Sequence, residues 1–162
     1  MAESKKFAYA DPPYIGQAKK HYNCKEIDHE QLLKKLMTFD MWALSCSSPS
    51  LKTILPMCPD TSRVGAWVKP FCIFKPNVNP AYSWEPVIFY NPRKRDRTVK
   101  TVRDHLSCNI TLKKGLVGAK PREFCFWLFN LMGLLPEDEV IDLFPGTGIV
   151  TECWRKLRGS ND

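Results

Sequence analysis

Short apolar runs separated by polar, proline-rich and glycine-rich segments predict that strands and helices alternate along this chain. Five runs have the length and the β-branched or aromatic composition of strands, namely residues 7–10, 41–46, 63–71, 84–92 and 140–144. The first ends at Asp11-Pro12-Pro13-Tyr14, where two residues without a backbone N–H stop any further pairing. The last is followed by the turn-forming run Pro145-Gly146-Thr147-Gly148.

The remaining apolar positions recur at helical spacing. Asp28, with Gln31 three residues later, predicts a capping box for a helix over the run "HEQLLKKLM". In residues 120–133, Pro121 suits the first turn of a second helix and Gly133 suits its end. A third helix is expected over residues 149–157. Strands alternating with helices favour an α/β fold with a mostly parallel sheet.

Composition sets the scale of the domain. The chain has 162 residues, of which 44% are apolar, and this suits one domain over residues 1–162. No run of about 18 apolar residues predicts a membrane span. The seven cysteines include no Cys-x-x-Cys pair, so we expect reduced thiols, no metal site and a cytoplasmic protein.

The net charge of +7 favours an acidic partner, with nucleic acid first. Much of this charge lies in residues 91–115, which we interpret as a basic loop and a nucleic-acid-binding insertion. The expected phosphate contacts are Arg93, Lys94, Arg95, Arg97, Lys100 and Arg103, widened by Lys19, Lys20, Lys113 and Lys114. The alternative interpretation is a solvated charged loop without a ligand.

Two glycines, Gly146 and Gly148, stand between the last expected strand and helix. Glycine at such a turn allows close approach of a ligand to the backbone, and the helix after it offers free N–H groups. No Gly-Lys-Ser/Thr follows, so the pattern is not a Walker loop, and the third glycine of the dinucleotide fingerprint is absent. A tight strand-to-helix turn without a ligand is the alternative.

Asp11-Pro12-Pro13-Tyr14 combines a carboxylate, carbonyl acceptors and an aromatic face at the end of a strand, where α/β folds bind ligands. Such a group suits a planar ring with an exocyclic amine, because Asp11 and a carbonyl can accept the amine hydrogens while Tyr14 stacks on the ring. A proline-rich turn without catalytic function is the alternative.

Together the two motifs resemble the S-adenosylmethionine-dependent DNA amino-methyltransferases that modify adenine N6 or cytosine N4. In that family Asp-Pro-Pro-Tyr is the catalytic motif, and Asp-x-Phe-x-Gly-x-Gly, which spans Asp142 to Gly148 here, binds the cofactor. The catalytic motif comes first and the cofactor motif last, as in a circularly permuted subgroup. The segment "GAKPREF", with Lys120 and Pro121, is similar to the part of that subgroup that closes over the cofactor's methionine end.

The resemblance implies a truncated, circularly permuted Rossmann-like methyltransferase fold with a mostly parallel sheet of about five strands. It implies catalytic roles for Asp11, Pro12, Pro13 and Tyr14 by in-line methyl transfer without a metal. The implied cofactor-binding residues are Asp142, Phe144, Pro145, Gly146, Thr147, Gly148, Lys120 and Pro121. Adenine N6 in DNA is the favoured target; cytosine N4 in DNA, adenine N6 in RNA, a small molecule, or a catalytically silent nucleic-acid-binding protein are the alternatives.

The chain also departs from that family. Few residues follow Gly148, so we expect a minimal member without the strands after the cofactor motif and without a separate target-recognition domain. The strand at Val140 to Phe144 should then lie at the edge of the sheet, where it could pair in a homodimer or be covered by a helix. This compactness suits a bacterial or viral origin.

Overall fold

The backbone forms a six-stranded sheet in the order β5-β3-β4-β2-β1-β6. In the computed structural model, residues 3–16, 25–111 and 119–159 are described. The strands are β1 (Lys6–Ala10), β2 (Met41–Ser45), β3 (Arg63–Val68), β4 (Trp84–Tyr90), β5 (His105–Ser107) and β6 (Glu139–Asp142). The expected strands are all present, and β5 is an additional one.

The direction of the strands decides which side chains meet. β1 runs parallel to both β2 and β6, and β3 runs parallel to β5. β4 alone is antiparallel to its neighbours β2 and β3. The carboxyl ends of the other five strands therefore lie at one edge of the described sheet, together with the start of β4. We call this edge the carboxyl edge.

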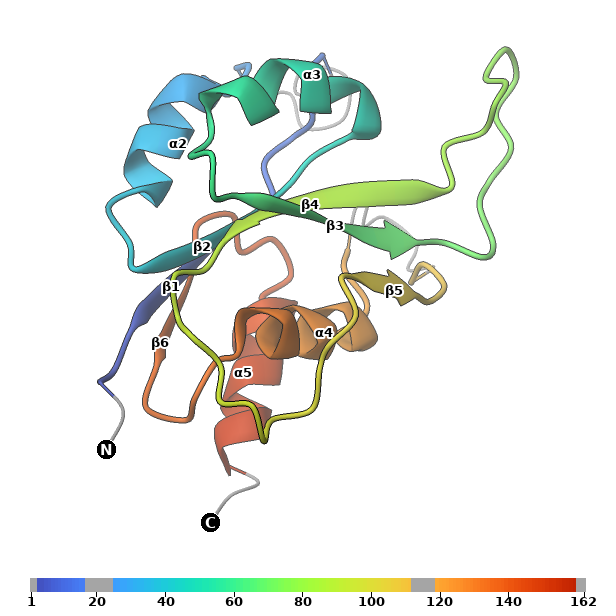
Figure 1. Ribbon diagram of the computed structural model, residues 1–162. Helices are drawn as coiled ribbons and strands as arrows, with labels where there is room; N and C mark the ends of the chain where they lie inside the picture. Colours follow the sequence, from blue (N-terminus) through green and yellow to red (C-terminus); the bar gives the residue numbers. More distant parts are fainter. Residues whose placement is uncertain (1–2, 17–24, 112–118, 160–162) are drawn as a thin grey trace.

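Helices cover both faces of the sheet (Figure 1). α2 (His29–Leu36) and α3 (Leu51–Ile54) lie on one face, and α4 (Arg122–Met132) and α5 (Ile149–Gly159) lie on the other. Because side chains alternate along a strand, β1 contributes side chains to the apolar clusters on both faces of the sheet. Ala8 and Ala10 belong to the apolar cluster on the α2 side, whereas Phe7 and Tyr9 belong to the cluster on the α4 side.

The helix ends follow local chemistry. Asp28 precedes α2, and its Oδ1 accepts a hydrogen bond from the Gln31 backbone N–H at 3.1 Å, as the sequence predicts. Gly133 ends α4 with φ 59°, which also agrees. Pro121 differs from expectation, since its ψ of 158° is extended. It is the residue before the helix and not part of the first turn.

β6 lies at an edge of the described sheet, as expected for the strand before the glycine loop. Only β1 pairs with it there. β5 falls inside the segment expected to be a loop. The sequence did not predict this strand, because three residues are too few to give a periodic signal and the strand forms by pairing with β3. Among the described residues, none of the helices has the length and apolar character needed to cross a membrane.

Candidate functional site

The two motifs from opposite ends of the sequence lie side by side at the carboxyl edge. Tyr9 of β1 is in register with Asp142 of β6, and the Leu143 N–H donates to the Tyr9 carbonyl at 2.9 Å. Asp11 leaves the end of β1 and the glycine loop leaves the end of β6. Parallel pairing of two adjacent strands therefore brings the Asp-Pro-Pro-Tyr motif next to the glycine motif.

A network of ion pairs lies beneath the Asp-Pro-Pro-Tyr motif. The Lys120 ammonium lies 3.2 Å from Asp11 Oδ2 and 3.0 Å from Glu85 Oε2. Lys69 lies 2.5 Å from Glu85 Oε1, and the Tyr14 hydroxyl donates to Glu85 Oε2 at 2.7 Å. Glu85 thus joins two lysines and the motif tyrosine.

Sequence reasoning did not single out Glu85. The only signal was its place in the strand-like run "WEPVIF", where a carboxylate among apolar residues must find a partner. Its side chain is 16% exposed. β4 is antiparallel to β2, so Glu85, near the start of β4, reaches the same edge as Asp11.

Lys120 is almost fully enclosed, with 4% of its side chain exposed. Its ammonium also lies 5.3 Å from the ring centre of Trp67 and 5.6 Å from that of Phe124. Burial by itself lowers the pKa of Lys120, but the charges of Asp11 and Glu85 outweigh it and raise the pKa above its usual value. Lys120 therefore remains a cation although its side chain is buried.

The two carboxyl groups of the network respond differently. Burial raises the pKa of Asp11, and the neighbouring Glu85 adds to this effect against the opposing charge of Lys120. Burial also acts to raise the pKa of Glu85, but Lys120 and Lys69 dominate and lower that pKa to about 2. Glu85 is therefore ionised at neutral pH, and it pairs with Lys120, the lysine that contacts Asp11.

The glycine loop has the backbone that its sequence predicts. Gly146 and Gly148 have φ values of 50° and 77°. The Gly148 N–H donates to the Pro145 carbonyl at 2.7 Å, and the Gly148 carbonyl accepts from the Glu152 N–H at 3.0 Å, in the first turn of α5. Apart from its chain neighbours, no described residue has an atom within 4 Å of the position that a Cβ of Gly148 would take.

Asp142 fixes the start of this loop. Its Oδ1 accepts a hydrogen bond from the Phe144 N–H at 3.1 Å. Burial raises the pKa of Asp142 to about 6, and the charge of Asp11 contributes to the same direction. Phe144 is partly buried and packs against the apolar cluster on the α2 side. Pro145, Gly146 and Thr147 are exposed.

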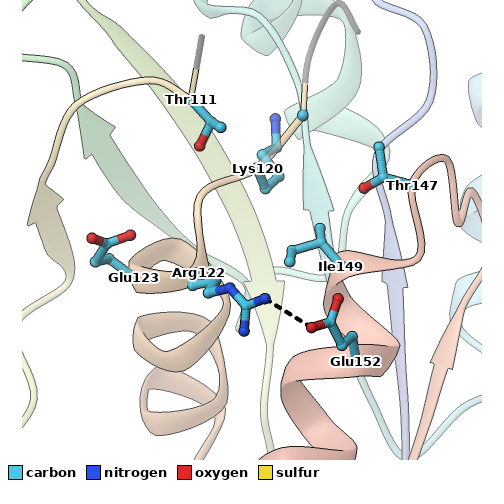
Figure 2. A pocket seen from close by; sticks show the side chains of 8 residues that line it. Thr111, Lys120, Arg122, Glu123, Thr147, Ile149 and Glu152 are labelled. Atoms are coloured by element: carbon cyan, nitrogen blue, oxygen red, sulfur yellow. Dashed lines mark hydrogen bonds and ion pairs between the residues drawn. The ribbon is translucent and has the colours of Figure 1, made fainter. Parts of the chain in front are cut away.

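A cleft of about 290 Å³ lies between the glycine loop and the start of α4 (Figure 2). At one side an ion pair between Arg122 and Glu152 joins α4 to α5 at 2.8 Å. The lining comprises Thr111, Ala119, Lys120, Arg122, Glu123, Thr147, Ile149 and Glu152. Two of the expected cofactor residues, Lys120 and Thr147, therefore line the cleft, and Pro121 is buried beside it. The Lys120 ammonium, however, has two carboxylate partners within the protein.

The basic segment lies away from this site. β4 ends at Tyr90 on the opposite edge of the sheet, and residues 91–104 then loop past α4 before β5 begins (Figure 1). The α4 helix separates the two regions; its 11 residues span about 16 Å. Among the described residues, the structure does not bring the expected phosphate contacts between Arg93 and Arg103 to the Asp-Pro-Pro-Tyr motif.

Two arginines of that segment have structural partners. Arg93 donates to both carboxylate oxygens of Asp138, at 2.6 and 2.7 Å, and to the Gly133 carbonyl at 3.0 Å. Arg95 donates to the carbonyls of Asn130 and Leu131 at the end of α4. Arg95 is nevertheless exposed, as are Lys94, Arg97, Lys100 and Arg103. Lys19, Lys20, Lys113 and Lys114 lie outside the described residues.

Comparisons with known proteins agree on the fold. No protein-family model matches this chain, and no curated protein matches it either. Solved structures do match, and together with the strand order they define a Rossmann-like methyltransferase fold.

Two of the matching structures are of M1.HpyAVI. Its complex with S-adenosylmethionine superposes with a TM-score of 0.64 at 16% identity, over 95% of this chain and 79% of that one. A second M1.HpyAVI structure gives 0.60 at 16% identity, over 96% and 78%. At this identity the likeness is one of fold.

Proposed function

We propose that this protein is an S-adenosylmethionine-dependent methyltransferase that modifies the exocyclic amine of a nucleobase, with adenine N6 in DNA as the favoured target. The observation that carries the proposal is the pairing of β1 with β6, which sets Asp11 beside the loop that contains Gly146 and Gly148. A base-binding motif and a cofactor-binding motif then share one edge, as methyl transfer between two ligands requires.

The cofactor fits the chemistry of the cleft. S-adenosylmethionine supplies the methyl group, and it carries an ammonium, a carboxylate and a sulfonium that need polar partners. Gly146 offers exposed backbone, Gly148 lets a ligand approach closely because it has no side chain, Thr147 offers a hydroxyl and Asp142 a carboxylate near the loop. In this proposal Phe144 and Pro145 shape the loop. Lys120 and Pro121 form the wall of the cleft opposite this loop. The likeness to a fold solved with S-adenosylmethionine supports the assignment.

In this proposal, Asp11 and the Pro12 carbonyl accept the two amine hydrogens of the target base, while Tyr14 stacks on its ring. These hydrogen bonds localise the nitrogen lone pair, which would form the new N–C bond as the S–C bond breaks and S-adenosylhomocysteine leaves; the methylated nitrogen then loses one of its two hydrogens as a proton, which passes to solvent. Pro13 keeps the motif extended. Lys120 and Glu85 hold Asp11 and Tyr14 in place, so most of the rate enhancement comes from positioning.

The same site accommodates the alternatives of cytosine N4 in DNA and adenine N6 in RNA, because all three targets present an aromatic amine. The catalytically silent protein is the remaining alternative. It is favoured by one observation, the ion pair between Lys120 and Asp11. In the enzyme this pair orients Asp11, whereas in a silent protein it would block Asp11.

Two further proposals concern the surface. Lys94, Arg97, Lys100 and Arg103 contribute general affinity for phosphates at a distance from the target base. In the described sheet β6 has a strand on one side only, and we propose the segment from Val140 to Phe144 as a homodimer contact. A mass equal to one chain at 100 µM in sedimentation equilibrium would exclude that dimer.

The function is tested by incubating the protein with methyl-labelled S-adenosylmethionine and duplex DNA, single-stranded DNA or RNA. Each polymer is then digested to nucleosides and read by mass spectrometry. We expect label in N6-methyladenine that disappears in Asp11→Asn, while calorimetric binding of S-adenosylmethionine persists in that variant. Label in N4-methylcytosine or in RNA selects an alternative target. Cofactor binding without label in any polymer would favour the silent protein.

A further inference from the structure

The segment between β3 and β4 projects from the carboxyl edge of the sheet (Figure 1, upper right). β3 ends at Val68 and β4 begins at Trp84, so residues 69–83 form this connection. Its base is tied to the candidate site, because Lys69 at one end contacts Glu85 at the other, and Glu85 accepts from Tyr14. The projection therefore stands beside the Asp-Pro-Pro-Tyr motif.

Exposed aromatic side chains are concentrated on this projection. Phe71, Phe74 and Tyr82 are 59%, 82% and 60% exposed, and Trp84 at its end is 38% exposed. These four are the large exposed aromatic residues of the described part of the chain, and all of them lie within 14 sequence positions. Ile73 adds a further apolar group, 60% exposed. Such a concentration marks an interaction surface.

The charge and the asparagine side chains of the projection indicate the chemical class of its binding partner. Residues 70–83 contain no acidic side chain and include Lys75. A hollow of about 420 Å³ lies between the projection and Ser48, close to the end of β2, and Asn77, Asn79, Tyr82 and Trp84 contribute to its lining. Asparagine amides pair with the edge of adenine, and aromatic faces stack on bases. The surface therefore offers both hydrogen bonds to the edges of bases and stacking on their faces.

We infer that residues 69–84 bind unpaired bases of the nucleic acid strand beside the target nucleotide, which makes single-stranded nucleic acid the preferred substrate. The inference rests on the proposed function. In a duplex the faces of the bases are covered by their neighbours, so several exposed aromatic groups find partners only on an unpaired strand. An unpaired target also enters the site without the cost of base flipping.

The test is fluorescence anisotropy with an end-labelled adenine-containing DNA strand of 12 nucleotides, alone or as a duplex, at fixed salt. We expect the single strand to bind more tightly than the duplex. Phe74→Ala should weaken strand binding about tenfold, the range for one stacked base. Phe74→Tyr should retain wild-type binding and Phe74→Leu should not, because stacking needs an aromatic face. Leu157→Ala, which removes another exposed apolar side chain at 40% exposure, is the matched control.

Three results would overturn the inference: equal or tighter binding of the duplex, unchanged strand binding in Phe74→Ala, or full binding in Phe74→Leu. A wild-type dimer that Phe74→Ala converts to a monomer, with unchanged strand binding, would assign the surface to a second copy of the chain instead. Methyl transfer measured on the same variants separates this inference from the proposed function. Aromatic-dependent strand binding without methyl transfer would keep residues 69–84 as a single-strand-binding surface and favour the catalytically silent protein over the enzyme. If Phe74→Ala leaves methyl transfer unchanged on every polymer, the inference is refuted and the proposed enzymatic function stands.

Discussion

Lys120 and Asp11, which are far apart in sequence, form a nearly enclosed ion pair with 3.2 Å between Nζ and Oδ2. Glu85 shares the same ammonium at 3.0 Å, so the position of Asp11 depends on residues from three separate segments. A carboxylate held in this way loses little conformational entropy when a base amine arrives. The ion pair therefore connects the stability of the fold with the geometry of the proposed reaction.

Removing the shared cation should destabilise the protein and abolish activity together. Lys120→Met removes the cation that pairs with Asp11 and leaves Asp11 close to Glu85, whose remaining counter-charge is Lys69, so we expect the free energy of unfolding to fall by about 3 kcal/mol, as for other broken buried pairs. Adding Glu85→Gln should restore part of the loss, because only one carboxylate then remains. Urea unfolding of the wild type, the two single variants and the double variant measures this coupling. Additive losses would show that the residues act independently.

Asp142 should make stability depend on pH. Its pKa is about 6 in the folded chain against an ordinary value of 3.8, so the folded state binds more protons between these values. The free energy of unfolding therefore falls as pH rises from about 4 to 6. Asp142→Asn keeps the acceptor for Phe144 and removes the charge.

We expect Asp142→Asn to be more stable than wild type at pH 7.5 by about 1 kcal/mol, after allowance for partial exposure. The difference should vanish near pH 4, where the carboxyl group is protonated. Thermal melts across this range provide the measurement, with the exposed Glu139→Gln as control. A constant difference at every pH would contradict the assignment.

Arg93 should be a structural residue and Arg97 should not. Arg93 is 14% exposed and pairs with the fully enclosed Asp138, which also accepts from the Lys5 and Leu135 N–H groups at 2.8 Å. Arg93→Ala should cost about 3 kcal/mol by leaving that charge unpaired. Arg97→Ala, on the exposed part of the same segment, should change stability by less than about 0.5 kcal/mol. Similar urea midpoints for both variants would refute this distinction.

The exposed basic residues should act through phosphates alone. Arg97, Lys100 and Arg103 reversed to Glu should lower nucleic acid affinity and reduce the slope of its logarithm against the logarithm of salt concentration. The slope should change by about one unit for each phosphate interaction removed, equally for all sequences. Arg93 and Arg95 are left unchanged because their reversal would disturb α4. An unchanged slope would assign these residues to a solvated surface.

Gly148 should be needed for its backbone conformation. Its φ of 77° strains any residue with a Cβ, although no atom stands in the way. Gly148→Ala should therefore cost about 1–2 kcal/mol and weaken S-adenosylmethionine binding measured by calorimetry. Gly159→Ala, also with open space around it and no left-handed φ, is the matched control. Equal binding by both variants would separate the loop from cofactor recognition.

Local chemistry explains why much of the fold could be predicted. The end of β1 follows from two prolines that lack an N–H, the end of α4 from the left-handed conformation of Gly133, and the start of α2 from the Asp28 side chain. These features depend on a residue and its near neighbours. The edge position of β6 required the family resemblance, and the strand order confirms it.

The sequence by itself determined five of the six described strands, the α/β class and the two motifs that meet at the site. Only the tertiary structure decided that Glu85 joins Lys69, Lys120 and Tyr14, that Arg93 and Arg95 hold the end of α4, and that the aromatic projection stands beside Asp11. The physical reason is that these contacts depend on strand direction and pairing. They join residues far apart in the chain, which local propensity and periodicity do not encode.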